Sequence, residues 1–240
     1  DWTLTATGST GFSGAGPSVS NGASFDAGTY NLSESAALPG YTNGTKWDCV
    51  GGTQNDPDTV TLGLGQSATC TITNNDQAGH LIVNKTTIPS DTTNEFSITA
   101  SGGTIVSPAA TQTIVGGGTV NYTVNAGTYN VIEAAEPGWD QTENTCVDVV
   151  VANGETEECT ITNTKRAHII IVKDVIGNPD STDFTFNNNF SNGNPAIFQL
   201  DEDNDGTLPS SRDFEVLPGT YTVSEDPVAD WQSPESTSCT

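Results

Sequence analysis

The sequence has few basic residues. Six Lys and Arg stand against 30 Asp and Glu among 240 residues, which gives a formal net charge of −24. A nucleic-acid-binding protein needs clustered basic side chains to contact phosphates, so this composition excludes that class. An anionic membrane surface would repel the chain for the same reason. The sequence also lacks an uninterrupted apolar stretch of about 18 residues, so we expect no membrane insertion in this segment.

Other signals are missing as well. No signal peptide is present and the sequence begins at Asp1, which indicates processing or a window cut from a longer protein. The five cysteines have no Cys-x-x-Cys spacing, which disfavours a zinc site and favours disulfides in an oxidising, extracellular location. Phosphate-binding glycine loops and the Gly-x-Ser-x-Gly motif are absent, so we expect no enzyme and no organic cofactor.

What the sequence does contain is an internal repeat. The pattern Gly-Thr-Tyr-x-apolar-x-Glu occurs three times and is followed each time by an aromatic residue and a cysteine. Its glutamates are Glu34, Glu133 and Glu225, and the rings that follow are Tyr41, Trp139 and Trp231. The pentapeptide Cys-Thr-Ile-Thr-Asn occurs twice, and Lys85 and Lys173 end two similar apolar segments. We therefore expect three tandem repeats: repeat 1 (residues 1–79), repeat 2 (residues 80–165) and repeat 3 (residues 166–240).

Both terminal repeats are incomplete in this alignment. Repeat 1 lacks the strand that contains Lys85 in repeat 2, and repeat 3 ends before the strand that contains Asn163. Two interpretations stay open at this point. The chain is an excerpt of a longer tandem array, or partner chains supply the missing strands by strand addition.

The local pattern of each repeat is that of β-structure. Polar and apolar residues alternate in Tyr129–Glu133 and in Cys159–Asn163, and Asn-Gly and Pro-Gly pairs separate such segments. Several short strands within about 90 residues are typical of an antiparallel Greek-key sandwich. We therefore predict an all-β protein made of tandem antiparallel Greek-key β-sandwiches of immunoglobulin-like type.

These motifs resemble the prealbumin-like (Cna protein B-type) domains that build stalks and pilus shafts on bacterial surfaces, and the resemblance covers essentially the whole chain. In that family a lysine of the first strand and an asparagine of the last strand form an intramolecular isopeptide bond assisted by a glutamate. The resemblance implies Lys85, Asn163 and Glu133 for these roles in repeat 2. It implies partial trios elsewhere, which are Glu34 with Asn74 and Lys173 with Glu225.

Strand parity supports this trio independently. Because side chains alternate between the two faces of a strand, Lys85, Glu133 and Asn163 each share a face with apolar neighbours and are expected to point into the core. A buried lysine loses its charge and becomes nucleophilic, and a buried glutamate can relay protons. Two other interpretations remain: a Lys85–Glu133 ion pair, or an edge-strand lysine that blocks aggregation.

The cysteines predict two disulfides within repeats, Cys49–Cys70 and Cys146–Cys159. Such loops would each stabilise the fold by about 3 kcal/mol in the chain-entropy model. These disulfides depart from the usual pattern of the family, which leaves the need for a second crosslink open. Cys239 has either lost its partner to truncation or forms a crosslink between chains.

One acidic segment resembles the first half of a calcium loop. Asp201, Asp203 and Asp205 precede Gly206 with the spacing Asp-x-Asp-x-Asp-Gly, but Arg212 occupies the position where an EF-hand has its bidentate acid. The segment is therefore no EF-hand. It either holds one Ca²⁺ through these three aspartates or forms a solvated acidic turn.

Together these features predict a non-enzymatic structural segment of an extracellular surface protein or filament, a crosslinked stalk or fibre. Its expected partners are neighbouring repeats of the same chain and copies of itself. Two alternatives remain. One is an adhesive or carbohydrate-binding module that uses the rings Tyr41, Trp139 and Trp231. The other is a self-assembling filament subunit completed by strand exchange.

Overall fold

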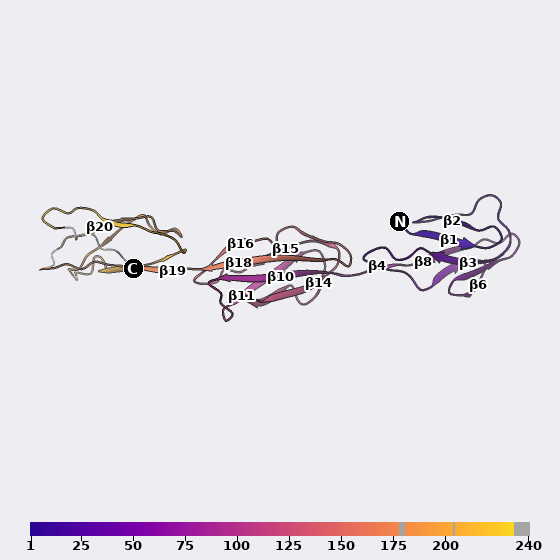
Figure 1. Cartoon of the computed structure of the whole chain (residues 1–240), viewed down its shortest axis with the longest axis horizontal. Coiled ribbons are helices and arrows are strands. Elements are labelled where there is room, and N and C mark those ends of the chain that lie inside the picture. Colours follow the sequence, from indigo (N-terminus) through magenta and orange to yellow (C-terminus); the bar gives the residue numbers. More distant parts are fainter. Residues whose placement is uncertain (178–180, 204, 233–240) are drawn as a thin grey trace.

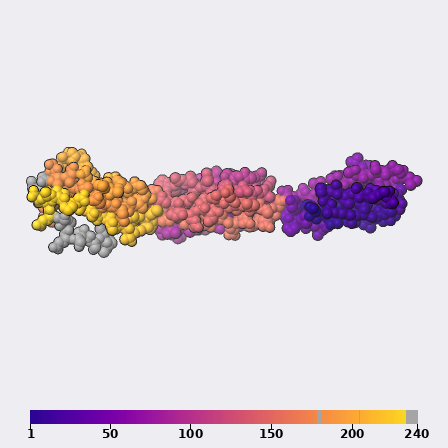
Figure 2. All heavy atoms as spheres, turned by 90° about the horizontal axis from the view of Figure 1, so that it is seen from above, coloured from indigo at the N-terminus to yellow at the C-terminus, as the bar shows by residue number. Residues whose placement is uncertain are grey.

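The computed structural model describes residues 1–177, 181–203 and 205–232, and these residues form strands and no helix. The all-β prediction is therefore confirmed. Three β-structured bodies follow one another along the long axis of an elongated molecule, in chain order (Figures 1 and 2). Within the described ranges there is no helix that is long and apolar enough to cross a membrane.

Repeat 2 is a sandwich of two sheets. One sheet has the strand order β12-β14-β10-β18-β16 and the other β13-β11-β15-β17. The bounds of the first are β12 Ile105–Ser107, β14 Thr119–Val124, β10 Gly79–Ile88, β18 Thr156–Lys165 and β16 Trp139–Asn144; those of the second are β13 Thr111–Val115, β11 Glu95–Gly102, β15 Gly127–Glu133 and β17 Val149–Val151. The facing sides enclose one apolar core in which Leu81, Phe96, Tyr122 and Ile161 are completely buried.

The central pair of this sandwich corrects the expectation of a purely antiparallel fold. β10 and β18 run parallel, in a register that pairs His80 with Thr156 and Ile88 with Thr164. β10 also continues for three residues beyond Lys85, although the sequence comparison ended the strand there. Because the first and last strands point the same way, the chain enters repeat 2 at one end and leaves it at the other (Figure 1).

Repeat 1 has a smaller core and a less complete set of strands. Its main sheet has the order β2-β1-β3-β7-β6, and two short pairs, β5·β8 and β4·β9, complete it. The bounds are β1 Thr3–Thr7, β2 Phe12–Ala15, β3 Gly28–Glu34, β4 Tyr41–Thr42, β5 Trp47–Val50, β6 Thr53–Asp56, β7 Thr59–Leu62, β8 Thr69–Ile72 and β9 Asn75–Asp76. Its buried cluster contains only Ala6, Tyr30 and Val60, so much of its inner surface is only partly covered.

Repeat 3 forms two small sheets, β19·β22 and β21-β20-β23. The bounds are β19 Ala167–Val172, β20 Phe184–Asn188, β21 Ile197–Leu200, β22 Ser211–Val216 and β23 Val223–Glu225. Its core is rich in phenylalanine, with Phe184 and Phe214 almost fully buried. Only Val223–Glu225 of the third Gly-Thr-Tyr-x-apolar-x-Glu motif is a strand, so this strand is shorter than its counterparts β3 and β15.

Short joints link the three bodies. Between repeats 1 and 2, the Gly154 amide donates to the Gln77 carbonyl at 2.9 Å, and the Gln77 amide donates to the Gly40 carbonyl at 2.8 Å. Gly40 has φ +77°, and a Cβ there would lie 2.0 Å from the Asn153 carbonyl oxygen, so only glycine fits this contact.

At the second joint, Arg166 contacts both repeats, and Asn192 of repeat 3 also donates to Asp140 of repeat 2 at 3.2 Å. Nε and Nη2 of Arg166 donate to the two carboxylate oxygens of Asp140 in repeat 2, at 2.9 and 2.7 Å. Nη1 donates to Glu215 of repeat 3 at 2.8 Å. A planar guanidinium that binds one carboxylate through two parallel hydrogen bonds restricts orientation more than a single contact does.

Candidate crosslinking site

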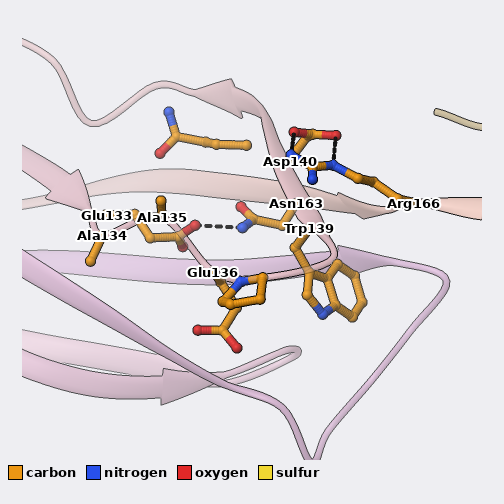
Figure 3. A pocket seen from close by; sticks show the side chains of 10 residues that line it. Glu133, Ala134, Ala135, Glu136, Trp139, Asp140, Asn163 and Arg166 are labelled. Carbon is orange, nitrogen blue, oxygen red and sulfur yellow. Dashed lines mark hydrogen bonds and ion pairs between the residues drawn. The ribbon is translucent and has the colours of Figure 1, made fainter. Parts of the chain in front are cut away.

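Lys85, Glu133 and Asn163 meet inside repeat 2. Lys85 lies on β10, Glu133 ends β15 in the opposite sheet, and Asn163 lies on β18. Lys85 Nζ donates to Asn163 Oδ1 at 2.7 Å and lies 3.0 Å from Glu133 Oε2. Asn163 Nδ2 donates to Glu133 Oε1 at 2.5 Å, and Figure 3 shows these two side chains facing each other. The trio therefore joins the first strand, the last strand and the second sheet.

Burial controls the protonation of this lysine. The side chains of Lys85 and Glu133 are 1% and 2% exposed. Nζ also lies 4.2 Å from the centre of the Phe96 ring, against which Trp139 packs edge-on. Burial is the larger influence and lowers the pKa of Lys85, while the hydrogen bond and negative charge of Glu133 raise it. A lowered pKa makes the neutral, nucleophilic amine more accessible.

The hydrogen bonds orient the three groups for amide exchange. The amine contacts the oxygen of the Asn163 amide, and the carboxylate contacts its nitrogen, which is the leaving group. Attack of Nζ on Cγ of Asn163 would form a new C–N bond, break the bond to Nδ2 and release ammonia. Glu133 can accept the proton from the amine and deliver it to the departing nitrogen. The structure shows the hydrogen-bonded trio, and the isopeptide bond itself stays a prediction.

The partial trios of the other repeats are assembled as far as their residues allow. In repeat 1, Asn74 Nδ2 donates to Glu34 Oε2 at 2.9 Å. In repeat 3, Lys173 Nζ lies 3.0 Å from Glu225 Oε2 and 3.8 Å from the centre of the Phe184 ring. Each repeat therefore places its available members of the motif next to each other.

The aromatic residue beneath each lysine was not recognised as part of the site from the sequence. Phe96 lies under Lys85, and Phe184 lies under Lys173 in the same way. The sequence contains a signal for this ring. The segments that begin at Trp2 and Phe96 align, and Phe184 follows Lys173 by the same number of residues as Phe96 follows Lys85.

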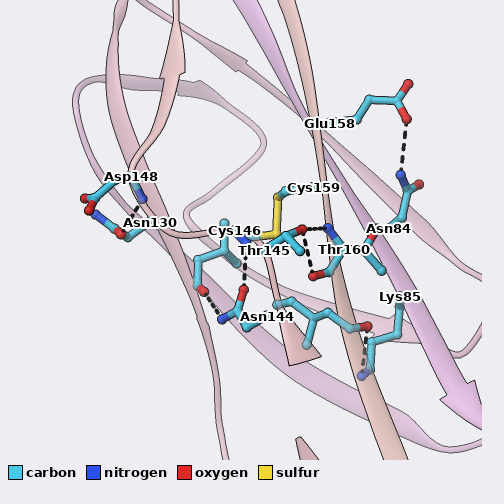
Figure 4. The surroundings of a disulfide bond; sticks show 12 residues. Asn84, Lys85, Asn130, Asn144, Thr145, Cys146, Asp148, Glu158, Cys159 and Thr160 are labelled. Atoms are coloured by element: carbon cyan, nitrogen blue, oxygen red, sulfur yellow. Dashed lines mark hydrogen bonds between the residues drawn. A yellow bond between two sulfur atoms is a disulfide. The ribbon is translucent and has the colours of Figure 1, made fainter. Parts of the chain in front are cut away.

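The structure contains the disulfides Cys49–Cys70 and Cys146–Cys159. The first joins the paired strands β5 and β8. The second ties the segment before β17 to β18, four residues before Asn163, and Figure 4 shows it beside Thr145 and Thr160. Cys239 lies outside the described residues.

The acidic segment of repeat 3 brings together Asp201, Asp203 and Asp205, with one carboxylate oxygen of each within 4.8 Å of the others. Three carboxylates are a donor set that suits a hard cation such as Ca²⁺. The same groups also serve the turn itself, because the amide of Thr207 donates to Asp205 and its hydroxyl donates to Asp201. Calcium binding stays a prediction.

The three repeated rings pack within their own bodies. Trp139 is 5% exposed and contacts Phe96. Tyr41 packs edge-on against Trp2, and Trp231 packs edge-on against Phe184. Trp139 is therefore a core residue, whereas Tyr41 and Trp231 are only partly buried.

Comparison with known proteins agrees with this architecture. The model of a family described as a prealbumin-like fold domain matches residues 1–72 and 76–171, which confirms the resemblance inferred from the sequence motifs. No curated protein matches the chain.

Among the solved structures that match the chain are proteins of Bacillus anthracis and Streptococcus pyogenes. The Bacillus anthracis TIE protein is 16% identical over 95% of this chain and 42% of its own, with a TM-score of 0.38. The Streptococcus pyogenes major pilin T3.2 is 15% identical over 57% of this chain and 66% of its own, with a TM-score of 0.32. The T-13 major pilin of the same species is 13% identical over 68% of this chain and 89% of its own, with a TM-score of 0.31. The chain thus spans less than two thirds of the TIE protein and of the T3.2 pilin.

Proposed function

We propose that this chain, which belongs to the family of prealbumin-like fold domains, is a structural segment of an extracellular stalk or filament in which Lys85 and Asn163 form an isopeptide bond. One observation carries the proposal. A buried lysine, glutamate and asparagine contact one another across the first and last strands of repeat 2. Glu133 would act once in each molecule, so the reaction is a maturation step and no turnover follows.

The parallel pairing explains what such a bond would do under tension. A pull along the molecule acts on the start of β10 and the end of β18, which are hydrogen-bonded neighbours over their length. Such a pull shears the pair, and the rate of forced unfolding then depends on how long this pair survives. A covalent bond between residues 85 and 163 transfers the force directly from β10 to β18. The chain between these two residues, which are 78 positions apart, would then carry no force and would stay folded.

The surface charge suits an exposed, extended role. A formal charge of −24 on 240 residues keeps neighbouring molecules apart and well solvated. The Arg166 clamp and the Gly40–Gln77–Gly154 hydrogen bonds limit bending between repeats. Both features favour a spacer that holds another part of an assembly away from a surface.

The test is the intact mass of the full chain after reduction and denaturation. We expect the parent to be lighter than its sequence mass by one ammonia molecule, and fragmentation should join residues 85 and 163. Glu133→Ala should restore the full mass. Glu34→Ala, which alters the corresponding glutamate of repeat 1, is the matched control and should keep the loss. An unshifted parent mass would reduce the trio to a buried ion pair and overturn the proposed crosslink.

A further inference from the structure

The outer face of one sheet in repeat 2 has almost no charge. Side chains alternate along β11 and β15, so every second residue points away from the core. On these two strands the outward residues with neutral side chains are Ser97, Thr99, Ser101, Thr128, Asn130 and Ile132. The flanking strands add Thr111 and Thr113 from β13 and Val150 from β17. Among the outward positions of this sheet, only Glu95 at the start of β11 is charged.

Repeat 1 has the same face in the same register. β1 and β3 are the counterparts of β11 and β15, because Thr5 pairs with Ser33 as Thr99 pairs with Ile132. The outward residues of β1 and β3 are Thr3, Thr5, Thr7, Thr29, Asn31 and Ser33, and all of them are neutral. Because 30 of the 240 residues are acidic, two uncharged surfaces at equivalent positions set these sheets apart. We call these two sets of six residues the neutral faces of repeats 1 and 2.

Acidic side chains lie on the opposite side of repeat 2. Glu158 projects from β18 and is exposed, and Asp140 and Glu143 lie on the neighbouring strand β16. A second copy of the chain that approached this side would meet carboxylates with its own charge of −24. Repulsion between two copies is weakest where neither presents charge, so the neutral faces are where copies can approach most closely.

The chemistry of the neutral faces also suits a second copy. Hydroxyl and amide side chains both donate and accept hydrogen bonds, so a surface made of them is complementary to itself. A two-fold contact needs this property, because the same patch faces itself. The hydroxyls of Thr99 and Thr111 pair across strands at 3.0 Å, and those of Thr29 and Thr61 at 2.8 Å. Side chains that are already held in this way lose less conformational entropy when they are covered.

We propose that two copies of this chain associate sheet against sheet through their neutral faces. Each outward residue covers roughly 33 Å² of a sheet, so about nine of them give a face of about 300 Å². If the faces of both repeats take part, two copies bury about 1,200 Å² in total, which is the lower limit for a stable interface. The contact is therefore weak between single chains and strong where many repeats align along neighbouring filaments.

This inference adds lateral association to the proposed stalk or filament, and it does not require the Lys85–Asn163 bond. Its test is sedimentation equilibrium of the full chain with Cys239→Ser, which prevents a disulfide between chains. In about 0.01 M NaCl, where the Debye length is about 30 Å, repulsion should keep the chain monomeric. In about 1 M NaCl, where it is about 3 Å, we expect dimers and an association constant at least about tenfold larger. Attraction between an acidic and a basic surface would instead weaken in salt.

A pair of matched variants locates the contact. Thr111→Glu with Thr128→Glu places two carboxylates on the neutral face of repeat 2, at exposed positions. We expect association in about 1 M NaCl to weaken at least about tenfold, because a carboxylate buried without a partner is costly even when salt screens long-range repulsion. The control is Thr86→Glu with Thr156→Glu, which adds the same charge at exposed positions of the opposite sheet and should associate like the parent.

Two results would overturn the proposal. One is a parent chain that stays monomeric at about 1 mM in about 1 M NaCl. The other is equal association of the neutral-face variant and the control variant, since the contact would then lie elsewhere. Circular dichroism of both variants checks that they are folded. The mass test of the Lys85–Asn163 bond is read on denatured chains, so its outcome is independent of this one.

Discussion

A double substitution in repeat 2 distinguishes a covalent bond from an ion pair by the sign of its effect on stability. Lys85→Met removes the amine but keeps an unbranched apolar side chain in the core. Glu133→Gln removes the buried carboxylate and keeps an amide that can still hydrogen-bond to Asn163, which Glu133 contacts at 2.5 Å in the parent. No unpaired charge stays buried in the double variant, so loss of the crosslink is the main change.

The expected magnitude follows from the loop that the bond closes. Residues 85 and 163 are 78 positions apart, for which the chain-entropy model gives about 4.5 kcal/mol of stabilisation. The Cys146–Cys159 disulfide lies inside this loop and shortens its path by a minor part, so the value stays above about 4 kcal/mol. If Lys85 and Glu133 form only an ion pair, the double substitution should not lower the stability of repeat 2. Replacing a buried ion pair by neutral groups is neutral or stabilising, by up to about 4 kcal/mol.

Native-state hydrogen exchange of the full chain measures this difference within repeat 2. Amides of β11 and β15 report the free energy of opening of the sandwich, and we expect it to fall by about 4 kcal/mol in the double variant. Glu34→Gln, which makes one of the two changes in repeat 1, should leave these amides unaffected. A double variant that is as stable as the parent, or more stable, would refute the crosslink.

Three further predictions concern other parts of the molecule. In a Glu133→Gln variant, burial holds the pKa of Lys85 below its ordinary 10.5, so the folded state binds fewer protons than the unfolded state. The urea concentration at the unfolding midpoint of repeat 2 should therefore increase when the pH is raised from about 7 to about 9, and a decrease would contradict this. Arg166→Lys loses the two-point contact with Asp140 and should broaden the distance distribution between spin labels in repeats 2 and 3, whereas an unchanged distribution would show that the clamp does not limit bending. Ca²⁺ should raise the melting temperature of repeat 3 in the parent but not in a variant with Asp203→Asn and Asp205→Asn, and equal shifts with Mg²⁺ would favour a simple acidic turn.

The sequence predicted the faces of the strands better than their directions. Leu81, Val83 and Lys85 are all buried on one side of β10, as the alternation required. The period of two is a local property and survives folding wherever one face is covered. The parallel pairing of β10 with β18 was not predicted, because strand direction depends on chain reversals over the whole of repeat 2. No local pattern of residues contains that information.

Contacts between side chains that lie far apart in the sequence were also not predicted. Arg166 occurs in a short joint, and nothing in that joint indicates that it binds Asp140 and Glu215 on opposite sides. Phe96 is an ordinary apolar strand residue in the sequence, and its position under Lys85 follows only from the packing of β11 against β10. The motif identified Lys85, Glu133 and Asn163, and the tertiary structure supplied the environment that lowers the pKa of Lys85.

The positions of the three residues in repeat 2 determine when the proposed bond could form. Lys85, Glu133 and Asn163 belong to the first strand, the opposite sheet and the last strand, so they meet only after the sandwich has closed. In an unfolded chain the lysine is solvated and protonated, and the amide has no carboxylate beside it. The proposed bond would therefore form after folding, and it would remove unfolding routes that separate β10 from β18. For the same reason, the ammonia loss measured on a whole preparation should equal the fraction of molecules in which repeat 2 has folded.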